Sequence, residues 1–289
     1  MRKISGLYKT ERNKRKKFDI EVPGSWDEMQ PGQFGAAIFC LQVTTKADPE
    51  WIKLSLLALL FEKHWPILAG LTAEEKHELK KELTKFFYDT EPPLKNFFPK
   101  LKLKAGELLP AAPDLSNIGF GEWCFLDTYL SYFYRSQGDE EWLDKMIATV
   151  YRPVDPESDE NSPNYTGDKR EPFNENLIPK RVEMLQDMKR NEKMAIFQWI
   201  SIAIKQAKDA RPDVFPEPLK QLDENGKPVP VTSDDEPGAD GSWMDIYTDL
   251  IGPKFGTSAQ LKYTNAFFVL DYLNKAQRQW TEFKSKNNA

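Results

Sequence analysis

The sequence predicts a mostly α-helical protein. We expect a multi-helix globular body with a short extended strand or arm at its N-terminus and two long polar loops. Three observations favour this fold class. Apolar residues recur at helical spacing along most of the chain. Capping residues and prolines mark the ends of these segments. Hydrophobic residues make up 40% of the 289 residues and aromatic residues 12%, which is enough to build a large core.

The most aromatic stretch, Gly119 to Pro153, is predicted to form two helices at the centre of this core. Asp139 is suited to cap the second helix, and Tyr151-Arg152-Pro153 ends it because proline disfavours the α conformation of its predecessor. Arg152 would then lie at the C-terminus of a buried helix, within reach of Asp127 or Glu122. We expect a structural clamp rather than an active site. The predicted core and clamp residues are Phe120, Glu122, Trp123, Asp127, Trp142, Tyr151 and Arg152.

Residues 1–24 are predicted to form a basic arm followed by an extended strand. The pattern Phe18 to Val22 alternates apolar and polar residues, as a strand does. A lone strand has no partner in itself, so it would pair with a neighbouring subunit. The basic run before it has two interpretations, a solvated and partly disordered tail or a contact with nucleic acid or an acidic partner. This run consists of Arg12, Lys14, Arg15, Lys16 and Lys17.

Residues 25–153 are predicted to form a first helical domain or half-domain. Ser25 with Glu28, and Thr72 with Glu75, have the spacing of capping boxes. Asp48-Pro49-Glu50 opens a helix whose sequence WIKLSLLALLF is apolar almost all round, so we expect that helix to be buried centrally. Leu101 to Lys104 is a candidate for a short edge strand.

Residues 154–175 are predicted to be a polar loop, because their composition provides too little apolar surface for independent order. The remainder, 176–289, is expected to be a second helical part packed on the first, with another polar loop at 221–242. One long helix is predicted from about Asn176 to Arg211. Two helices close the chain, and the last is expected to be lined by Leu261, Phe268, Tyr272 and Ala276.

No motif in the sequence indicates catalytic, cofactor or metal chemistry. There are only two histidines, His64 and His77, and neither has the HExxH spacing of a zinc site. No CxxC pair, Gly-rich phosphate loop or GxSxG motif is present, and the acidic stretch 234–240 lacks the spacing of a calcium loop. We therefore predict no cofactor and no enzyme activity, although an enzyme site assembled from scattered residues would leave no such motif.

Composition and charge limit the binding partners and the cellular compartment that we expect for this protein. A formal net charge of −5 gives no global argument for binding nucleic acid or a membrane. Cys40 and Cys124 lie in apolar helical patterns, so we expect buried, reduced thiols. The basic N-terminus is not followed by the apolar segment of a signal peptide, and no apolar run approaches the roughly 20 residues of a membrane span. We expect synthesis in the cytoplasm.

The phrases FGEW, LDTYL and DEEWLDKMIATVYRP, preceded by SWDEMQPGQF, resemble a group of uncharacterised phage and prophage proteins. The closing helices are similar to those of tail-associated proteins, some described as tail-assembly proteins or chaperones. The matching positions are Phe120, Gly121, Glu122, Asp127, Tyr151, Arg152 and Pro153. This resemblance implies a virion component or assembly factor.

We therefore expect a non-enzymatic structural or assembly protein of the phage tail or neck region. It would act through contacts with other virion or assembly proteins and through self-association, first in the host cytoplasm and then in the virion. The alternatives are a nucleic-acid-associated protein that uses the basic arm, and an enzyme with an unrecognised site.

Overall fold

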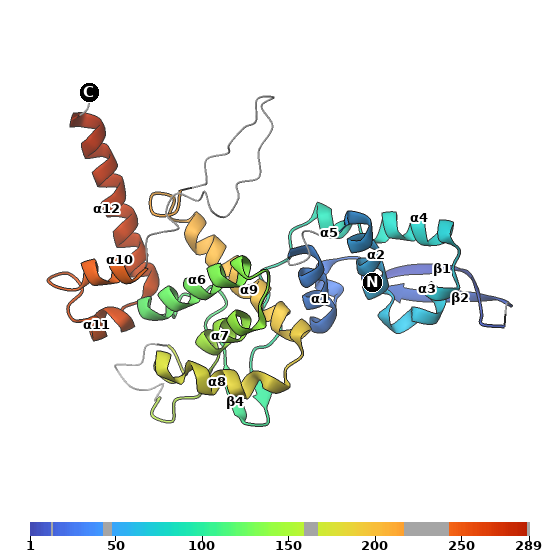
Figure 1. Ribbon diagram of the computed structural model, residues 1–289, viewed down its shortest axis with the longest axis horizontal. Coiled ribbons are helices and arrows are strands. Elements are labelled where there is room, and N and C mark those ends of the chain that lie inside the picture. Colours follow the sequence, from blue (N-terminus) through green and yellow to red (C-terminus); the bar gives the residue numbers. More distant parts are fainter. Residues whose placement is uncertain (13, 43–47, 159–166, 217–242, 288–289) are drawn as a thin grey trace. The chain divides into compact units, whose positions relative to one another are not determined.

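The computed structural model describes residues 1–12, 14–42, 48–158, 167–216 and 243–287, and it confirms the mostly α-helical fold class (Figure 1). The predicted loop at 221–242 and the acidic stretch 234–240 lie outside the described residues. The chain divides into two compact units. The first comprises Met1–Phe97 and Met188–Trp199, and the second comprises Phe98–Asp187 and Ile200–Ala289. No helix of the described residues is long and apolar enough to cross a membrane.

The first unit begins with an antiparallel hairpin. Strand β1 (Arg2–Lys9) pairs with β2 (Arg15–Val22), so that Ile4 lies opposite Ile20. The basic run is exposed, as the solvated interpretation predicts, but it belongs to a hairpin rather than to a partly disordered tail. The predicted strand is not a lone strand either, so it needs no neighbouring subunit to complete this pairing. The partner of the predicted strand is the polar segment that precedes it. Sequence reasoning missed β1 because it has few apolar residues, and its Leu7 is exposed.

Short helices follow the hairpin. They are a 3₁₀ turn at Trp26–Glu28, α1 (Pro31–Gln42), α2 (Pro49–Leu60), a 3₁₀ turn at Glu62–His64, α3 (Trp65–Gly70), α4 (Ala73–Leu83) and α5 (Phe86–Asp89). Trp26 forms the aromatic centre of this unit, with its ring edge-on to Phe34 at 5.4 Å and to Phe87 at 4.9 Å. Edge-to-face rings at such distances contribute about 0.5–1.5 kcal/mol each beyond the area that they bury.

The predicted helix starts are confirmed in three cases of four, and the cap predicted at Asp139 accepts from Glu141 N. The Asp48 side chain accepts a hydrogen bond from Glu50 N, and Thr72 and Glu75 form a full capping box. Ser25 makes no capping bond, and the prediction there is wrong. The carboxylate of Glu28 accepts instead from Gly24 N at 2.7 Å, which leaves only a 3₁₀ turn before α1 begins at Pro31.

Helix α2 is buried on one face only, so the prediction of a centrally buried helix is wrong. Ile52, Leu56 and Leu57 are buried, whereas Trp51 and Leu54 are about half exposed. The reason is that α2 packs against α1 and α4, which cover one side of it. An all-apolar sequence shows that a helix can be buried, but only the placement of its neighbours decides how much of it is.

The second unit contains a small sheet and the longer helices. Strands β3 (Leu101–Leu103), β4 (Gly106–Leu109) and β5 (Arg152–Pro153) are antiparallel with β4 in the middle, which confirms the predicted edge strand. The helical elements are α6 (Phe120–Arg135), α7 (Glu140–Val150), a 3₁₀ turn at Glu175–Leu177, α8 (Ile178–Met184), a 3₁₀ turn at Leu185–Asp187, α10 (Trp243–Leu250), α11 (Ser258–Tyr263) and α12 (Ala266–Asn287). Helix α9 (Arg190–Asp209) contributes its first half to the first unit and its second half to this one.

Two long predicted helices are divided in the structure. The helix expected over 176–211 is interrupted before Arg190, where the Glu192 carboxylate accepts from Lys189 N and starts a new helix. The final helix is interrupted at Asn265, whose side chain accepts from the backbone N of Phe267 and Phe268. In both places a polar side chain accepts hydrogen bonds from free N–H groups where a new helix starts. The prediction overlooked these capping residues because the apolar spacing continues across them.

Gly35 in α1 allows a close approach within the first unit. A Cβ atom at this position would lie 1.7 Å from the carbonyl oxygen of Asn191, which begins the first turn of α9. We expect Gly35→Ala to lower the free energy of unfolding by about 1–3 kcal/mol, as overpacking does. The measurement is urea unfolding followed by circular dichroism. Gly32→Ala in the same helix is the control, because nothing lies within 4 Å of its added Cβ; an equal loss in both variants would contradict the close-packing argument.

Candidate functional site

Glu122, in the first turn of α6, is a buried carboxylate held between two arginines. Its two oxygens lie 3.0 Å from Arg152 Nη2 and 3.2 Å from Arg170 Nη1. All three side chains are at most 3% exposed. Buried charges are tolerated only when they are paired and hydrogen-bonded, so this contact ties α6 to β5 and to the segment around Arg170.

Further bonds extend this network, which we call the arginine cluster. Asp168 contacts Arg170 at 2.7 Å and Arg152 at 3.3 Å. Arg152 Nη1 donates to the Glu171 carbonyl oxygen at 2.6 Å, and the Glu171 carboxylate pairs with Arg181 at 3.4 Å. Three guanidinium groups thus face three carboxylates. The cluster consists of Glu122, Arg152, Asp168, Arg170, Glu171 and Arg181.

The charge states of the cluster favour a structural role. Burial lowers the pKa of Arg152 to about 10, which still leaves it charged at neutral pH. Burial alone would raise the pKa of the Asp168 carboxyl, but hydrogen bonds and charge from Arg170 outweigh it and bring the pKa below its ordinary value. Both groups stay ionised at neutral pH, so they hold the chain together rather than exchange protons.

The structure assigns different partners to the predicted clamp residues. Arg152 contacts Glu122, one of the two carboxylates expected for it. Asp127 instead pairs with Lys208 at 2.7 Å and accepts from Trp243 Nε1 at 3.0 Å. Phe120, Trp123 and Tyr151 are fully buried, whereas Trp142 is half-buried against Tyr132.

Three residues of the cluster come from the segment that was predicted to be an unordered polar loop. Val154 pairs with Arg170 in a β-bridge, and Arg170 and Phe173 are buried. The described part of 154–175 is a loop, as predicted, but the ion pairs of the cluster hold it in place. Residues 159–166 are outside the described part. Composition correctly indicated a lack of apolar residues, but not that charged residues would be ordered by an ion-pair network.

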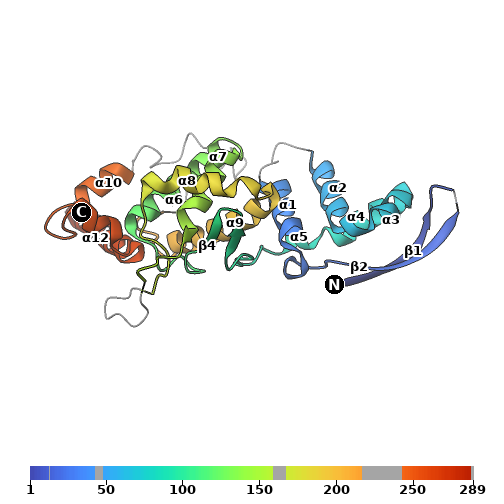
Figure 2. The ribbon, with the colours of Figure 1, turned by 90° about the horizontal axis from the view of Figure 1, so that it is seen from below.

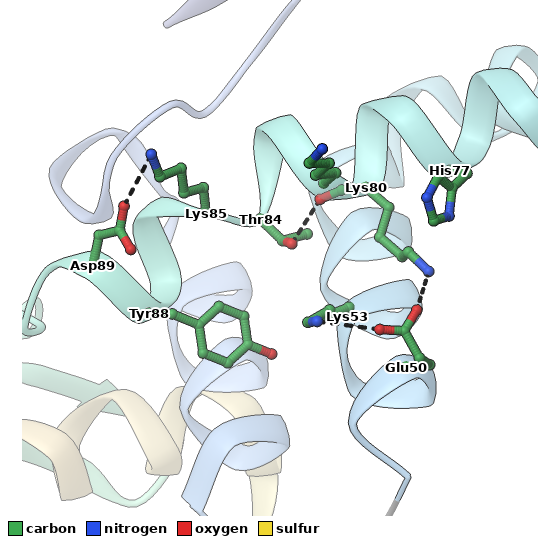
Figure 3. Close-up of a pocket in the computed structure, with 9 residues that line it drawn as sticks. Glu50, Lys53, His77, Lys80, Thr84, Lys85, Tyr88 and Asp89 are labelled. Atoms are coloured by element: carbon green, nitrogen blue, oxygen red, sulfur yellow. Dashed lines mark hydrogen bonds and ion pairs between the residues drawn. The ribbon is translucent and has the colours of Figure 1, made fainter.

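A second group of charged side chains lines a shallow pocket of about 630 Å³ in the first unit (Figure 3). Glu50 on α2 pairs with Lys53 at 3.1 Å and with Lys80 of α4. Hydrogen bonds from Lys80 and Lys53 lower the pKa of Glu50 to about 2. A general acid or base at neutral pH needs a pKa near 7. The lowered pKa of Glu50 is therefore shifted away from the range that such catalysis requires. The lining residues are Glu50, Lys53, His77, Lys80, Lys81, Thr84, Lys85, Tyr88 and Asp89.

The remaining candidates for chemistry are dispersed. Cys40 and Cys124 are thiols and not part of a disulfide. Cys124 is buried, but Cys40 is only partly buried, which corrects the expectation for that residue. Burial raises the pKa of both thiols, which disfavours the reactive thiolate. Within the described ranges, no group of three or more His, Cys, Asp or Glu residues is arranged to hold a metal ion.

Helix α12 carries an apolar stripe that is buried at one end and exposed at the other. The stripe has heptad spacing and consists of Ala266, Val269, Leu273, Ala276, Trp280 and Phe283. Ala266 and Val269 are fully buried, whereas Trp280 and Phe283 are 52% and 60% exposed and stack on each other at 6.1 Å. Phe268, expected on the inner face, is 64% exposed, so that prediction is wrong. In Figure 1 the end of α12 extends beyond its neighbours α10 and α11.

The basic run predicted at the N-terminus lies at the tip of the β1–β2 hairpin. Arg15, Lys16 and Lys17 begin β2, while Arg12 and Lys14 belong to the turn before it. All five side chains are exposed. The hairpin therefore holds these cations together at one end of a paired ribbon.

We expect Arg152→Ala to lower the free energy of unfolding by about 3–5 kcal/mol, because it leaves a buried carboxylate short of a partner. Urea unfolding monitored by tryptophan fluorescence measures this change. Lys104→Ala is the control, because both Lys104 and its ion-pair partner Asp187 are exposed. Removing this pair should lower the free energy of unfolding by about 0–1 kcal/mol. Equal stability of Arg152→Ala and the unaltered chain would contradict the clamp.

The cluster also predicts loss of stability in acid. The pKa of Asp168 is lower in the folded chain than in the unfolded chain, so its contribution is complete above the unfolded value of about 3.9 and is lost as pH falls through the folded value. Urea midpoints at about pH 6 and pH 3 should therefore differ less in Asp168→Asn than in the unaltered chain. An unchanged difference would show that Asp168 does not carry this pH dependence.

Comparison of the chain with family models, with curated proteins and with solved structures finds no match. The resemblance to phage tail-associated proteins therefore stays a prediction.

Proposed function

We propose that this chain is a non-enzymatic structural or assembly protein that acts by binding other proteins, in the manner of a phage tail or neck component. One observation carries the proposal: the apolar stripe of α12 continues past the part that its own unit covers. Trp280 and Phe283 extend the line of Ala266 and Val269 onto an exposed helix surface. The motif resemblance is what directs the proposal toward phage assembly.

The exposed end of α12 has little to stabilise it within its own unit. From Gln277 to Asn287 every residue is exposed. Helices shorter than about 12–15 residues are marginal in water without packing, and most helical stability in proteins comes from a covered apolar face. A partner that covers Trp280 and Phe283 would supply that packing. Aromatic residues of this kind dominate the energetics of protein interfaces.

The charges around the stripe indicate which charge the surface of a partner should carry. Between Lys275 and Asn287 there are four basic side chains and one acidic side chain, Glu282. A second copy of the same helix would bring like charges together. We therefore infer that the occupant is a different protein with an apolar groove bordered by carboxylates, which would accept α12 as a helix in a groove. The four basic residues are Lys275, Arg278, Lys284 and Lys286, of which Arg278 already pairs with Asp213 at 2.9 Å.

The test is binding to purified virion or assembly proteins encoded beside this chain, measured by light scattering and by calorimetry. We expect one of them to form a complex, and Trp280→Ala with Phe283→Ala to weaken it about 30-fold or more, which corresponds to the 2 kcal/mol of an interface hot spot. The free energy of unfolding of the isolated chain should change little, because both side chains are already exposed.

The matched control is Thr281→Ala with Ser285→Ala, which changes two exposed residues of the same helix segment away from the stripe. This control should bind as the unaltered chain does. An unaltered chain that stays monomeric and binds none of these proteins would contradict the proposal. An equal loss of binding in both double variants would contradict the assignment of the stripe as the interface.

A further inference from the structure

The β1–β2 hairpin concentrates positive charge at its tip. Six basic side chains lie within nine residues there, with Glu11 as the one acidic residue among them, although the whole chain has a net charge of −5. All six are exposed, and none forms an ion pair with any described residue. The ion pairs of the hairpin involve Met1, Arg2 and Lys3, at its other end. The tip cations are Lys9, Arg12, Lys14, Arg15, Lys16 and Lys17.

The strand register places like charges where they repel. Lys9 is paired directly with Arg15, and the next residues of β2, Lys16 and Lys17, face Tyr8 and Leu7 rather than carboxylates. Like charges directly opposite each other in an antiparallel pair are destabilising. Among the described residues no carboxylate forms an ion pair with these cations. Binding of an anion at the tip would therefore relieve the repulsion between them.

The rest of the hairpin is firmly placed, so the tip is a fixed structure rather than a loose tail. Ile20 and Val22 are buried, and the Tyr8 and Phe18 rings pack edge-on at 6.1 Å. Gly70, at the end of α3, approaches so closely that an added Cβ would lie 2.2 Å from the carbonyl oxygen of Lys9. β1 ends at this contact, and the tip of the hairpin lies past α3 (Figure 2).

We propose that this basic tip binds the phosphate backbone of double-stranded nucleic acid by entering a groove, an activity independent of the α12 interface. Successive strand residues point to opposite faces, so Lys9, Arg15 and Lys17 lie together on the exposed face of the ribbon. Lys16 lies on the other face, beside Tyr8, which contacts Gly70 of α3. The major groove of DNA admits a two-stranded β-ribbon, and there the cations of the exposed face and of the turn would contact phosphates.

The same features argue against an acidic protein as the partner. Protein interfaces depend on buried aromatic or aliphatic anchors, and the exposed face of the tip offers only Leu7. Phosphate contacts need neither an anchor nor a particular sequence, and they provide most of the affinity of non-specific binding.

The experiment is fluorescence anisotropy of a labelled duplex of about 20 base pairs, titrated with the full chain at salt concentrations from about 50 to 200 mM. We expect the logarithm of the binding constant to fall linearly with the logarithm of salt concentration, with a slope of roughly −4 to −5 for five phosphate contacts. The test variant replaces Arg12, Lys14, Arg15 and Lys17 with glutamine. Its slope should shrink by roughly three to four, and its affinity at about 50 mM salt should fall at least tenfold.

The matched control removes the same number of charges elsewhere, by changing Lys63, Lys81, Lys102 and Lys180 to glutamine. These four lysines are exposed and form no ion pair with described residues. The control should keep the affinity and slope of the unaltered chain, and circular dichroism should show that both variants fold. Three results would overturn the proposal: no duplex binding at about 50 mM salt, equal losses in the two variants, or tighter binding to polyglutamate of matched charge than to the duplex.

Discussion

The second unit depends on one constraint: a carboxylate removed from water must be paired. Glu122 meets it with two guanidinium groups that come from different places in the chain, one just after α7 and one from a segment poor in apolar residues. That segment is held in place by its ion pairs together with the buried side chain of Phe173. A buried ion pair adds little net stability over a hydrophobic alternative, but breaking one side of it is costly. The pairing therefore makes the arrangement of α6, β5 and residues 168–171 highly specific.

The entry to α6 links this constraint to the C-terminal helices. Phe120 N donates to the Thr264 carbonyl oxygen, and Ala266 N donates to that of Ile118, so the segment between α11 and α12 pairs with the chain that leads into α6. An added Cβ at Gly119 would lie 2.6 Å from the Lys262 carbonyl oxygen, which explains a glycine at this entry. The buried start of α12 is fixed in this way, and its exposed end is carried by the same rigid helix.

The two proposed surfaces follow a common physical logic. Exposed, stacked aromatic residues on a helix end add little to the stability of the isolated chain, and like charges opposite each other in a hairpin lower it. Departures from local consistency of this kind are expected at sites that function by binding. The buried parts of the molecule show the opposite behaviour, since their charges are paired.

Much of the fold could be predicted from sequence because its signals are local. Thr72 with Glu75 and Asp139 are capping residues whose bonds span two or three positions, and the apolar period of α6 and α7 is confined to each helix. Features that depend on contacts between distant parts of the chain were not predicted. The partner of β2 lies in a strand with little apolar pattern, and Arg170 lies in a segment whose composition indicates a loop. Neither is visible without knowing which segments come together.

By itself, then, the sequence determined the helical class, the capped helix starts at Asp48, Thr72 and Asp139, and much of the aromatic core, because helix propensity, capping and burial periodicity act over a few residues. Only the tertiary structure decided which carboxylate Arg152 meets, that Asp127 belongs to Lys208, and that the stripe of α12 is covered at Ala266 but open at Trp280. Those outcomes depend on which surfaces lie next to each other in space, and burial and pairing are properties of that arrangement rather than of any stretch of chain.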